Sequence, residues 1–180
     1  MDIGGITERF VPHDDARLRL APAAVIGVVL RNILVGHRPV YALGEWAEPF
    51  DEAVLGLAEG DIAALNDDRV GRMLDRLFDA DRATMITEVV LGVCRRFEVD
   101  TSRLHNDSTT VTVTGADYPG GGEERGGKLV AKPTFGHNKD HRPDLRQLLF
   151  VLTVSGDGAV LIAYRVEDGN TSDDVTHIPT

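Results

Sequence analysis

The stretch LHNDSTTVTVTG, residues 104–115, decides the fold because it marks a change from helical to strand periodicity. Before about residue 99, apolar residues recur every three or four positions, whereas in this stretch valines and threonines alternate with other polar residues. Such alternation, with many β-branched side chains, is typical of a β-strand. We therefore predict a strand through residues 103–114, with the carboxylate of Asp107 inside it.

The residues before this stretch predict helices. Pro22 suits a first helical turn, and the apolar run 23–35 ends at Gly36, a residue type that often follows a helix. A run of that length fits a buried helix better than a strand. The next residues, 36–46, are predicted to form a turn that holds an aromatic pair.

More helices are expected between residues 51 and 97. Residues 51–58 predict a short helix, Asp61 is placed to cap another, and Asp67 or Asp68 caps a longer one. Apolar residues at helical spacing then form two stripes, Val70, Met73, Leu74, Leu77 and Phe78 in the first and Ile86, Val89, Val90, Val93 and Phe97 in the second. We predict an antiparallel helical pair whose stripes bury each other.

Strand patterns fill the rest of the chain. The glycine-rich residues 119–127 cannot form a helix or a central strand, and without a GxxxxGK[ST] pattern they do not indicate a phosphate-binding loop. Apolar runs at 147–154 and 159–166 flank the turn sequence SGDG and predict a β-hairpin. The sequence thus predicts an α+β fold, with a helical domain at residues 1–99 and three mainly antiparallel strands in a domain at residues 100–180.

Composition favours a folded protein of the reducing cytoplasm. Of the 180 residues 42% are hydrophobic, which is enough to build a core. The single cysteine, Cys94, excludes an intrachain disulfide and lies in an apolar stripe, which indicates a buried thiol. The longest apolar stretch, residues 20–30, is too short to span a bilayer, and the first residues lack the pattern of a signal peptide. We therefore expect a cytoplasmic protein without a membrane partner.

Charge argues against nucleic acid over most of the chain, but not everywhere. The formal net charge is −10, which repels phosphate at long range. Within residues 125–146 the balance reverses, since two aspartates face six cations. Five of these cations are the candidate DNA contacts: Lys128, Lys132, Lys139, Arg142 and Arg146. An ordinary solvated basic loop is the alternative interpretation.

Asp107 is the candidate catalytic carboxylate. Alternation places it on the same strand face as the valines that follow it, and a carboxylate on an apolar line is unfavourable unless it is paired, metal-bound or exposed. His105 lies on that face as well, but a His-x-Asp pair is too small to define a metal site. A structural aspartate bonded to neighbouring hydroxyls is the alternative for Asp107, and His137, Asp140 and His141 form a second candidate metal group.

The motifs together resemble bacterial insertion-sequence transposases of the DDE type. The matching segments are RNILVGHRPVYAL at 31–43, LNDDRVGRMLDRLFDAD at 65–81, HNDSTT at 105–110, NKDHRPDLRQLLF at 138–150 and EDGNTSDD at 167–174. The resemblance runs from about residue 21 to the end of the sequence. It implies a helical amino-terminal region followed by the first three strands of an incomplete catalytic domain folded like ribonuclease H.

The resemblance also implies a reaction and its partners. In such enzymes three carboxylates bind two Mg²⁺ ions, which activate the attacking oxygen and stabilise the leaving oxygen at phosphorus. On this match Asp107 is the first of the three carboxylates, both a catalytic residue and a metal ligand. The expected partners are DNA at the ends of the element and further copies of the chain in a homo-oligomer.

The sequence departs from the family pattern after the third strand. The second and third carboxylates of the family lie on later elements, and Asp168, Asp173 and Asp174 belong to a turn and do not replace them. We therefore expect a truncated transposase that is inactive by itself and holds Mg²⁺ poorly. A non-catalytic DNA-binding or oligomerising regulator is one alternative. A small metal phosphoesterase built on Asp107, His105 and the loop 137–141 is another.

Overall fold

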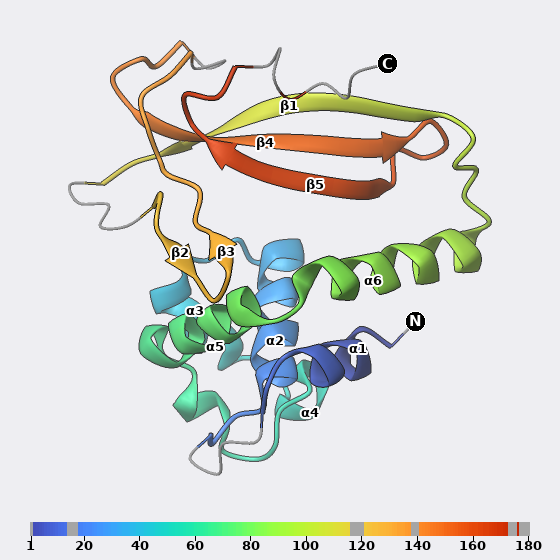
Figure 1. Ribbon diagram of the computed structural model, residues 1–180. Coiled ribbons are helices and arrows are strands. Elements are labelled where there is room, and N and C mark those ends of the chain that lie inside the picture. Colours follow the sequence, from blue (N-terminus) through green and yellow to red (C-terminus); the bar gives the residue numbers. More distant parts are fainter. Residues whose placement is uncertain (1, 14–17, 116–120, 138–140, 173–175, 177–180) are drawn as a thin grey trace. The chain divides into compact units, whose positions relative to one another are not determined.

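The computed structural model describes residues 2–13, 18–115, 121–137, 141–172 and 176. The chain divides into two compact units, Met1–Val89 and Val90–Thr180, and the division falls within helix α6, Arg82–Phe97. Helices build the first unit, and a three-stranded antiparallel sheet builds most of the second (Figure 1). The predicted α+β class is therefore confirmed.

The helical unit is a set of short helices around one apolar helix. Its elements are α1 Ile3–Phe10, α2 Pro22–Val35, the 3-10 turn η1 Val40–Ala42, α3 Leu43–Ala47, α4 Glu52–Leu55, the 3-10 turn η2 Ile62–Ala64, α5 Asp67–Asp79 and the first part of α6. Side chains cap several of them. Asp2 accepts a hydrogen bond from the Gly5 amide at the start of α1, and Asp51 accepts one from the Ala53 amide at the start of α4.

Helix α2 is the centre of this unit. It begins with Pro22 in its first turn and ends before Gly36, as the sequence predicts. Its residues are apolar on nearly all sides, which is typical of a helix surrounded by others. Val25 and Val28 are buried in a core with Leu43, Leu55 and residues of α5.

The predicted pairing of the last two helices is wrong in part. Val70 and Met73 of α5 join the core around α2, which leaves Leu74 39% exposed. Met85 of α6 packs in a second core with residues of α1 and α2, and Phe97 is 70% exposed. The reason is that the apolar surface of α2 attracts the stripe of α5, a partner choice that helical periodicity does not specify.

Two local expectations also need correction. The N-cap of α5 is Asn66, whose side chain accepts a hydrogen bond of 2.9 Å from the Arg69 amide, and not one of the two aspartates that follow it. The segment 36–46 is not only a turn, because it contains η1 and most of α3. Trp46 pairs with Phe50, which lies beyond this segment, and the two ring centroids are 5.0 Å apart.

The second unit contains the predicted sheet. Its strands are β1 Leu104–Val113, β4 Arg146–Ser155 and β5 Leu161–Asp168, in the order β1–β4–β5, with both pairs antiparallel. These strands begin and end within about two residues of the predicted runs. Strand β5 starts at Leu161 because Gly158 and Ala159 have positive φ angles in the hairpin turn.

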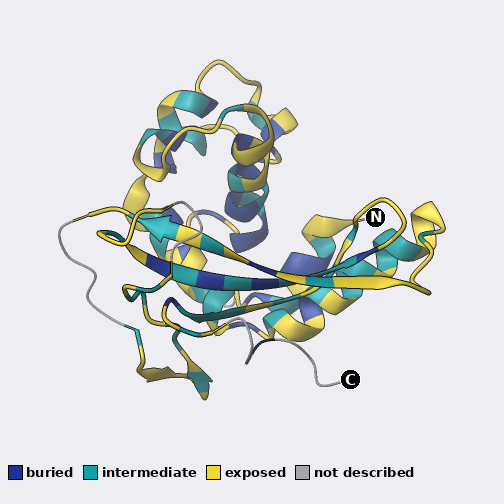
Figure 2. Ribbon diagram, turned by 90° about the horizontal axis from the view of Figure 1, so that it is seen from above, coloured by how far each residue is buried: buried dark blue, intermediate teal, exposed yellow. Residues whose placement is uncertain are grey.

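Burial alternates along the central strand. In β4 the side chains of Leu149 and Val151 are buried, and Figure 2 shows the buried positions spaced along that strand. A small hairpin precedes it, with β2 Glu124–Arg125 and β3 Lys128–Leu129 joined through Gly126 and Gly127. Both glycines have positive φ angles, which a two-residue hairpin turn requires.

None of the described helices alone combines the length and apolar composition of a membrane-spanning helix. The bent pair Pro22–Val35 and Val40–Ala47 meets those criteria only when its two parts are taken together.

Candidate functional site

Asp107 lies in the middle of the first strand of the sheet. It is opposite Leu152 of β4, which in turn is opposite Tyr164 of β5. The Asp107 side chain is exposed, and its Oδ1 accepts a hydrogen bond of 2.8 Å from the Ser108 amide. The carboxylate is therefore bonded to its own strand, at an exposed position of the sheet.

The environment of Asp107 differs from the predicted apolar line. Val111, which shares its face, is 47% exposed, whereas the alternate position Ser108 is buried. Ser108 is opposite Val151, and Thr110 is opposite Leu149, so the polar face of β1 lies beside the buried side chains of β4. Pairing with β4 thus decides which face of β1 is buried, and Asp107 avoids the cost of burying a charge.

The described residues do not provide enough ligands for a divalent metal ion. His105 lies on the same face as Asp107, opposite Val154, and it is exposed. No group of three or more histidine, cysteine, aspartate or glutamate side chains able to hold a metal occurs in the part of the chain that the structure describes. Asp140, of the second candidate group, lies outside that part. Mg²⁺ usually needs several oxygen ligands, so the described residues do not fit a stable site.

The predicted DNA contacts occupy different places on the second unit. Lys128 is half-buried in the short strand β3, and Lys132 is exposed in the segment that follows. Arg142 and Arg146 are both exposed, the second at the start of β4. Lys139 lies outside the described residues.

Arg142 is already bound to a carboxylate. Its Nε and Nη2 atoms donate to the two carboxylate oxygens of Asp144 over 2.9 and 2.7 Å. This hydrogen bonding lowers the pKa of Asp144 from its ordinary value, and the same contact raises the pKa of Arg142. A bidentate pair of this kind offsets the charge of the arginine locally, which weakens Arg142 as a contact to DNA phosphate.

A buried glutamine joins two of the segments that the sequence singles out. The Nε2 atom of Gln147, which is 2% exposed, donates to the carbonyl oxygen of Gly169 over 2.7 Å and to that of His137 over 3.4 Å. The backbone of Gln147 also exchanges two hydrogen bonds with Thr134, of 2.9 and 3.1 Å. Strand β5 pairs with β4 only as far as Asp168. Beyond that point the segment around Thr134 pairs with β4.

Close backbone contacts reinforce this junction. A β-carbon on Gly136 would overlap the carbonyl oxygen of Gly169, and one on Gly169 would overlap that of Gln147. The Asp168 carboxylate accepts a hydrogen bond of 2.7 Å from the Lys132 amide. We refer to Lys132, Thr134, Gly136, Gln147 and Gly169 as the glutamine junction. Asp168 is a structural ligand of this junction, and Asp173 and Asp174 lie outside the described residues.

The junction presents an aromatic residue that the sequence did not single out. The Arg146 guanidinium lies over the ring of Phe135, 5.6 Å from its centroid, and Phe135 is 57% exposed. Lys132 is exposed three residues before Phe135. The only available sequence signal was a lone phenylalanine in the basic stretch KPTFGHNK, and nothing local shows that Arg146 covers it.

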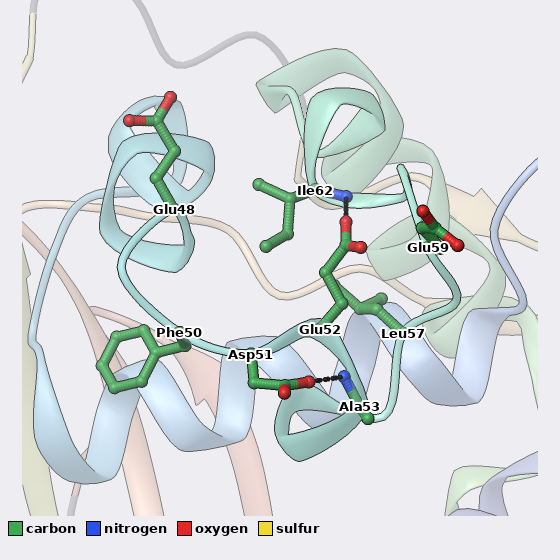
Figure 3. A pocket seen from close by; sticks show the side chains of 8 residues that line it. All are labelled: Glu48, Phe50, Asp51, Glu52, Ala53, Leu57, Glu59 and Ile62. Atoms are coloured by element: carbon green, nitrogen blue, oxygen red, sulfur yellow. Dashed lines mark hydrogen bonds between the residues drawn. The ribbon is translucent and has the colours of Figure 1, made fainter.

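The helical unit contains an acidic hollow of about 600 Å³, drawn in Figure 3. Glu48 and Glu59 lie on opposite sides of it, and Asp51 and Glu52 contribute further carboxylates. Two of these groups serve the backbone. Asp51 caps α4, and Glu52 accepts hydrogen bonds from the amides of Gly60 and Ile62 over 2.9 and 3.1 Å. Asp51 and Glu52 therefore have a structural role, which is to hold the backbone around this hollow.

Comparison with known proteins finds one family that matches the helical unit. Residues 1–91 match a family described as "Domain of unknown function (DUF4277)". No match was found among curated proteins or among solved structures. The family match ends within two residues of the helical unit, Met1–Val89. Because it covers just over half of the 180 residues, the chain belongs to the DUF4277 family.

Proposed function

We propose that this chain carries the helical region and the first catalytic strands of a DDE-type insertion-sequence transposase. Asp107 would be the first of the three carboxylates of that enzyme class, and DNA its substrate. The observation that supports this most is the position of Asp107, exposed in the middle of the first strand of an antiparallel sheet β1–β4–β5. An exposed residue on the outer strand of the sheet is accessible to phosphate and its counterions.

A second observation supports the same proposal. The sequence segments 138–150 and 167–174, on which the resemblance rests, come from separate parts of the chain. The hydrogen bond from Gln147 to Gly169 brings them together at one end of the sheet. Residues that match one family pattern and also meet in space are easier to explain by a shared role than by chance.

The electrostatics favour DNA at that end of the sheet. Lys132 and Arg146 are exposed there, whereas the chain as a whole has a formal net charge of −10. Contacts to DNA phosphates release bound counterions, so the binding should weaken steeply as salt increases. Arg142, which is bound to Asp144, should contribute less than the other two.

The proposed chemistry uses two further carboxylates besides that of Asp107. The other two belong, in the family that the sequence resembles, to elements after the third strand. We therefore expect the 180-residue chain to show no strand cleavage with Mg²⁺ or Mn²⁺. The same chain joined to the region that follows the matching sequence in a longer relative should cleave DNA from the flanks of its gene. Failure of every such extended chain, with DNA binding intact, would contradict the proposal.

A second candidate function needs only the helical unit. The family match covers the helical unit and stops before β1, so this unit is a module in its own right. The chain could then act as a non-catalytic DNA-binding or oligomerising regulator. The two candidates differ in the extended-chain assay, because a regulator binds DNA without gaining cleavage activity.

A further inference from the structure

We propose that Phe135 and Arg146 form a stacking platform for an unpaired base, so that the end of the sheet binds single-stranded DNA. Lys132 would contact a neighbouring phosphate. This inference rests on the proposed function, since it specifies the form of DNA that the basic end of the sheet contacts. It adds an aromatic residue, Phe135, and a preference for single-stranded over duplex DNA. The transposase resemblance implies neither.

The geometry of the pair provides the first argument. The Arg146 guanidinium lies over the Phe135 ring with 5.6 Å between its central carbon and the ring centroid. More than half of the Phe135 side chain nevertheless remains exposed. An exposed aromatic ring stacked on a cation suits a nucleotide, because every nucleotide has a base with a face that stacks and a phosphate that attracts the cation.

The rigidity of the site provides the second argument. Phe135 stands between Thr134, which is bonded twice to the backbone of Gln147, and Gly136, which packs against the Gly169 carbonyl. The ring is therefore attached to backbone that is fixed on both sides. A preorganised exposed ring loses little entropy when a ligand binds, and an exposed ring that serves no partner gains nothing from such support.

The charges around the ring provide the third argument. Lys132, His137 and Arg146 are exposed near Phe135 along the chain or in space. The Asp168 carboxylate accepts a hydrogen bond from the Lys132 amide through its Oδ1 atom. Asp144 is held by Arg142. Exposed basic side chains beside the ring suit a phosphate chain, and the ring supplies a stacking surface for an unpaired base.

The test compares DNA forms and phenylalanine variants. Fluorescence anisotropy would measure binding of the 180-residue chain to an oligothymidylate of about 16 nucleotides and to a duplex of the same length. The oligothymidylate should bind more tightly. Phe135→Ala should weaken its binding about tenfold or more, and should leave the dependence on salt unchanged, because no phosphate contact is lost.

The chain offers a matched control. Phe97 is 70% exposed and has the Arg96 guanidinium 5.8 Å from its ring centroid, but it lies at the end of α6. Phe97→Ala should leave oligothymidylate binding unchanged. Phe135→Trp should restore it, and the new indole should lose fluorescence on binding, a signal that a purely structural role of Phe135 would not produce.

The outcomes separate this inference from the proposed function. If Lys132→Ala weakens DNA binding but Phe135→Ala does not, the platform is wrong and the DNA contact stands. Tighter binding of the duplex than of oligothymidylate would also overturn the platform. If neither form of DNA binds even at low salt, the inference fails together with the DNA contact on which it rests.

Discussion

The side-chain amide of Gln147 donates a hydrogen bond of 2.7 Å to the carbonyl oxygen of Gly169, which is 22 residues away along the chain. This bond is buried and closes the end of the sheet where β5 stops. It also sets the position of the segment that carries Phe135, because Gln147 binds Thr134 through its backbone. The proposed binding surface at Phe135 therefore depends on a stable glutamine junction.

Replacing Gly169 by alanine tests the close packing of the junction. The new β-carbon would overlap the carbonyl oxygen of Gln147 and lie 2.7 Å from that of Thr134. Backbone atoms cannot move aside as a flexible side chain does, so we expect a loss of about 1–3 kcal/mol in the free energy of unfolding. Urea unfolding would measure the loss, and hydrogen exchange should show faster exchange of the Thr134 amide.

Gly71 provides a control of opposite sign. A β-carbon at this position in α5 meets no atom within 4 Å. Gly71→Ala should therefore stabilise the helical unit by about 0.5–1 kcal/mol, since alanine is the better helix former. If Gly169→Ala were as well tolerated as Gly71→Ala, the close contact at the junction would be wrong.

Two leucines test the location of the helical core. Leu43 is 1% exposed and belongs to the core around α2, whereas Leu74 is 39% exposed on α5. Leu43→Ala should cost about 2–5 kcal/mol in the free energy of unfolding, because it leaves a cavity. Leu74→Ala should cost about 1 kcal/mol or less. Equal losses of stability in the two variants would favour the helical pair that the periodicity predicts. They would contradict a core built around α2.

Local patterns predicted the elements of this fold better than their partners. The turn sequence SGDG and the alternation of β1 depend on neighbouring residues, and both led to the correct antiparallel strands. The partner of α5 depends on α2, which is separated from it by several short helices. Helical spacing therefore predicts the stripe of Val70 and Met73 but not the exposure of Leu74.

In the candidate site, too, local features are easier to predict than contacts between distant residues. Asp107 was placed correctly within a strand, because strand periodicity is local. The sequence leaves open whether the Asp107 side chain is paired, metal-bound or exposed, because the register with β4 decides which face of β1 is buried. Phe135 was missed, since its contact with Arg146 and its support by Gln147 join residues more than ten positions apart.

The pair of Arg142 and Asp144 should have a measurable titration. The hydrogen bond from Arg142 lowers the pKa of Asp144 below the ordinary aspartate value of 3.8. A lowered pKa in the folded chain favours folding above that ordinary value, and the benefit is lost as the pH falls through the lowered pKa. Carboxyl NMR should find the Asp144 midpoint below that of an unpaired aspartate, and Arg142→Gln should raise it. An unchanged midpoint in the variant would show that the pair does not persist in solution.

Replacing Asp107 in an extended chain tests the account most directly. The 180 residues would be joined to the following region of a longer relative, and strand cleavage of DNA from the gene's flanks would be measured with Mg²⁺. We predict that Asp107→Asn abolishes cleavage while the affinity for DNA stays nearly unchanged. Thr109→Ala, an exposed change on the same face of β1, should keep both activities. Full cleavage by the Asp107→Asn chain would contradict the assignment of Asp107 and with it the proposed function.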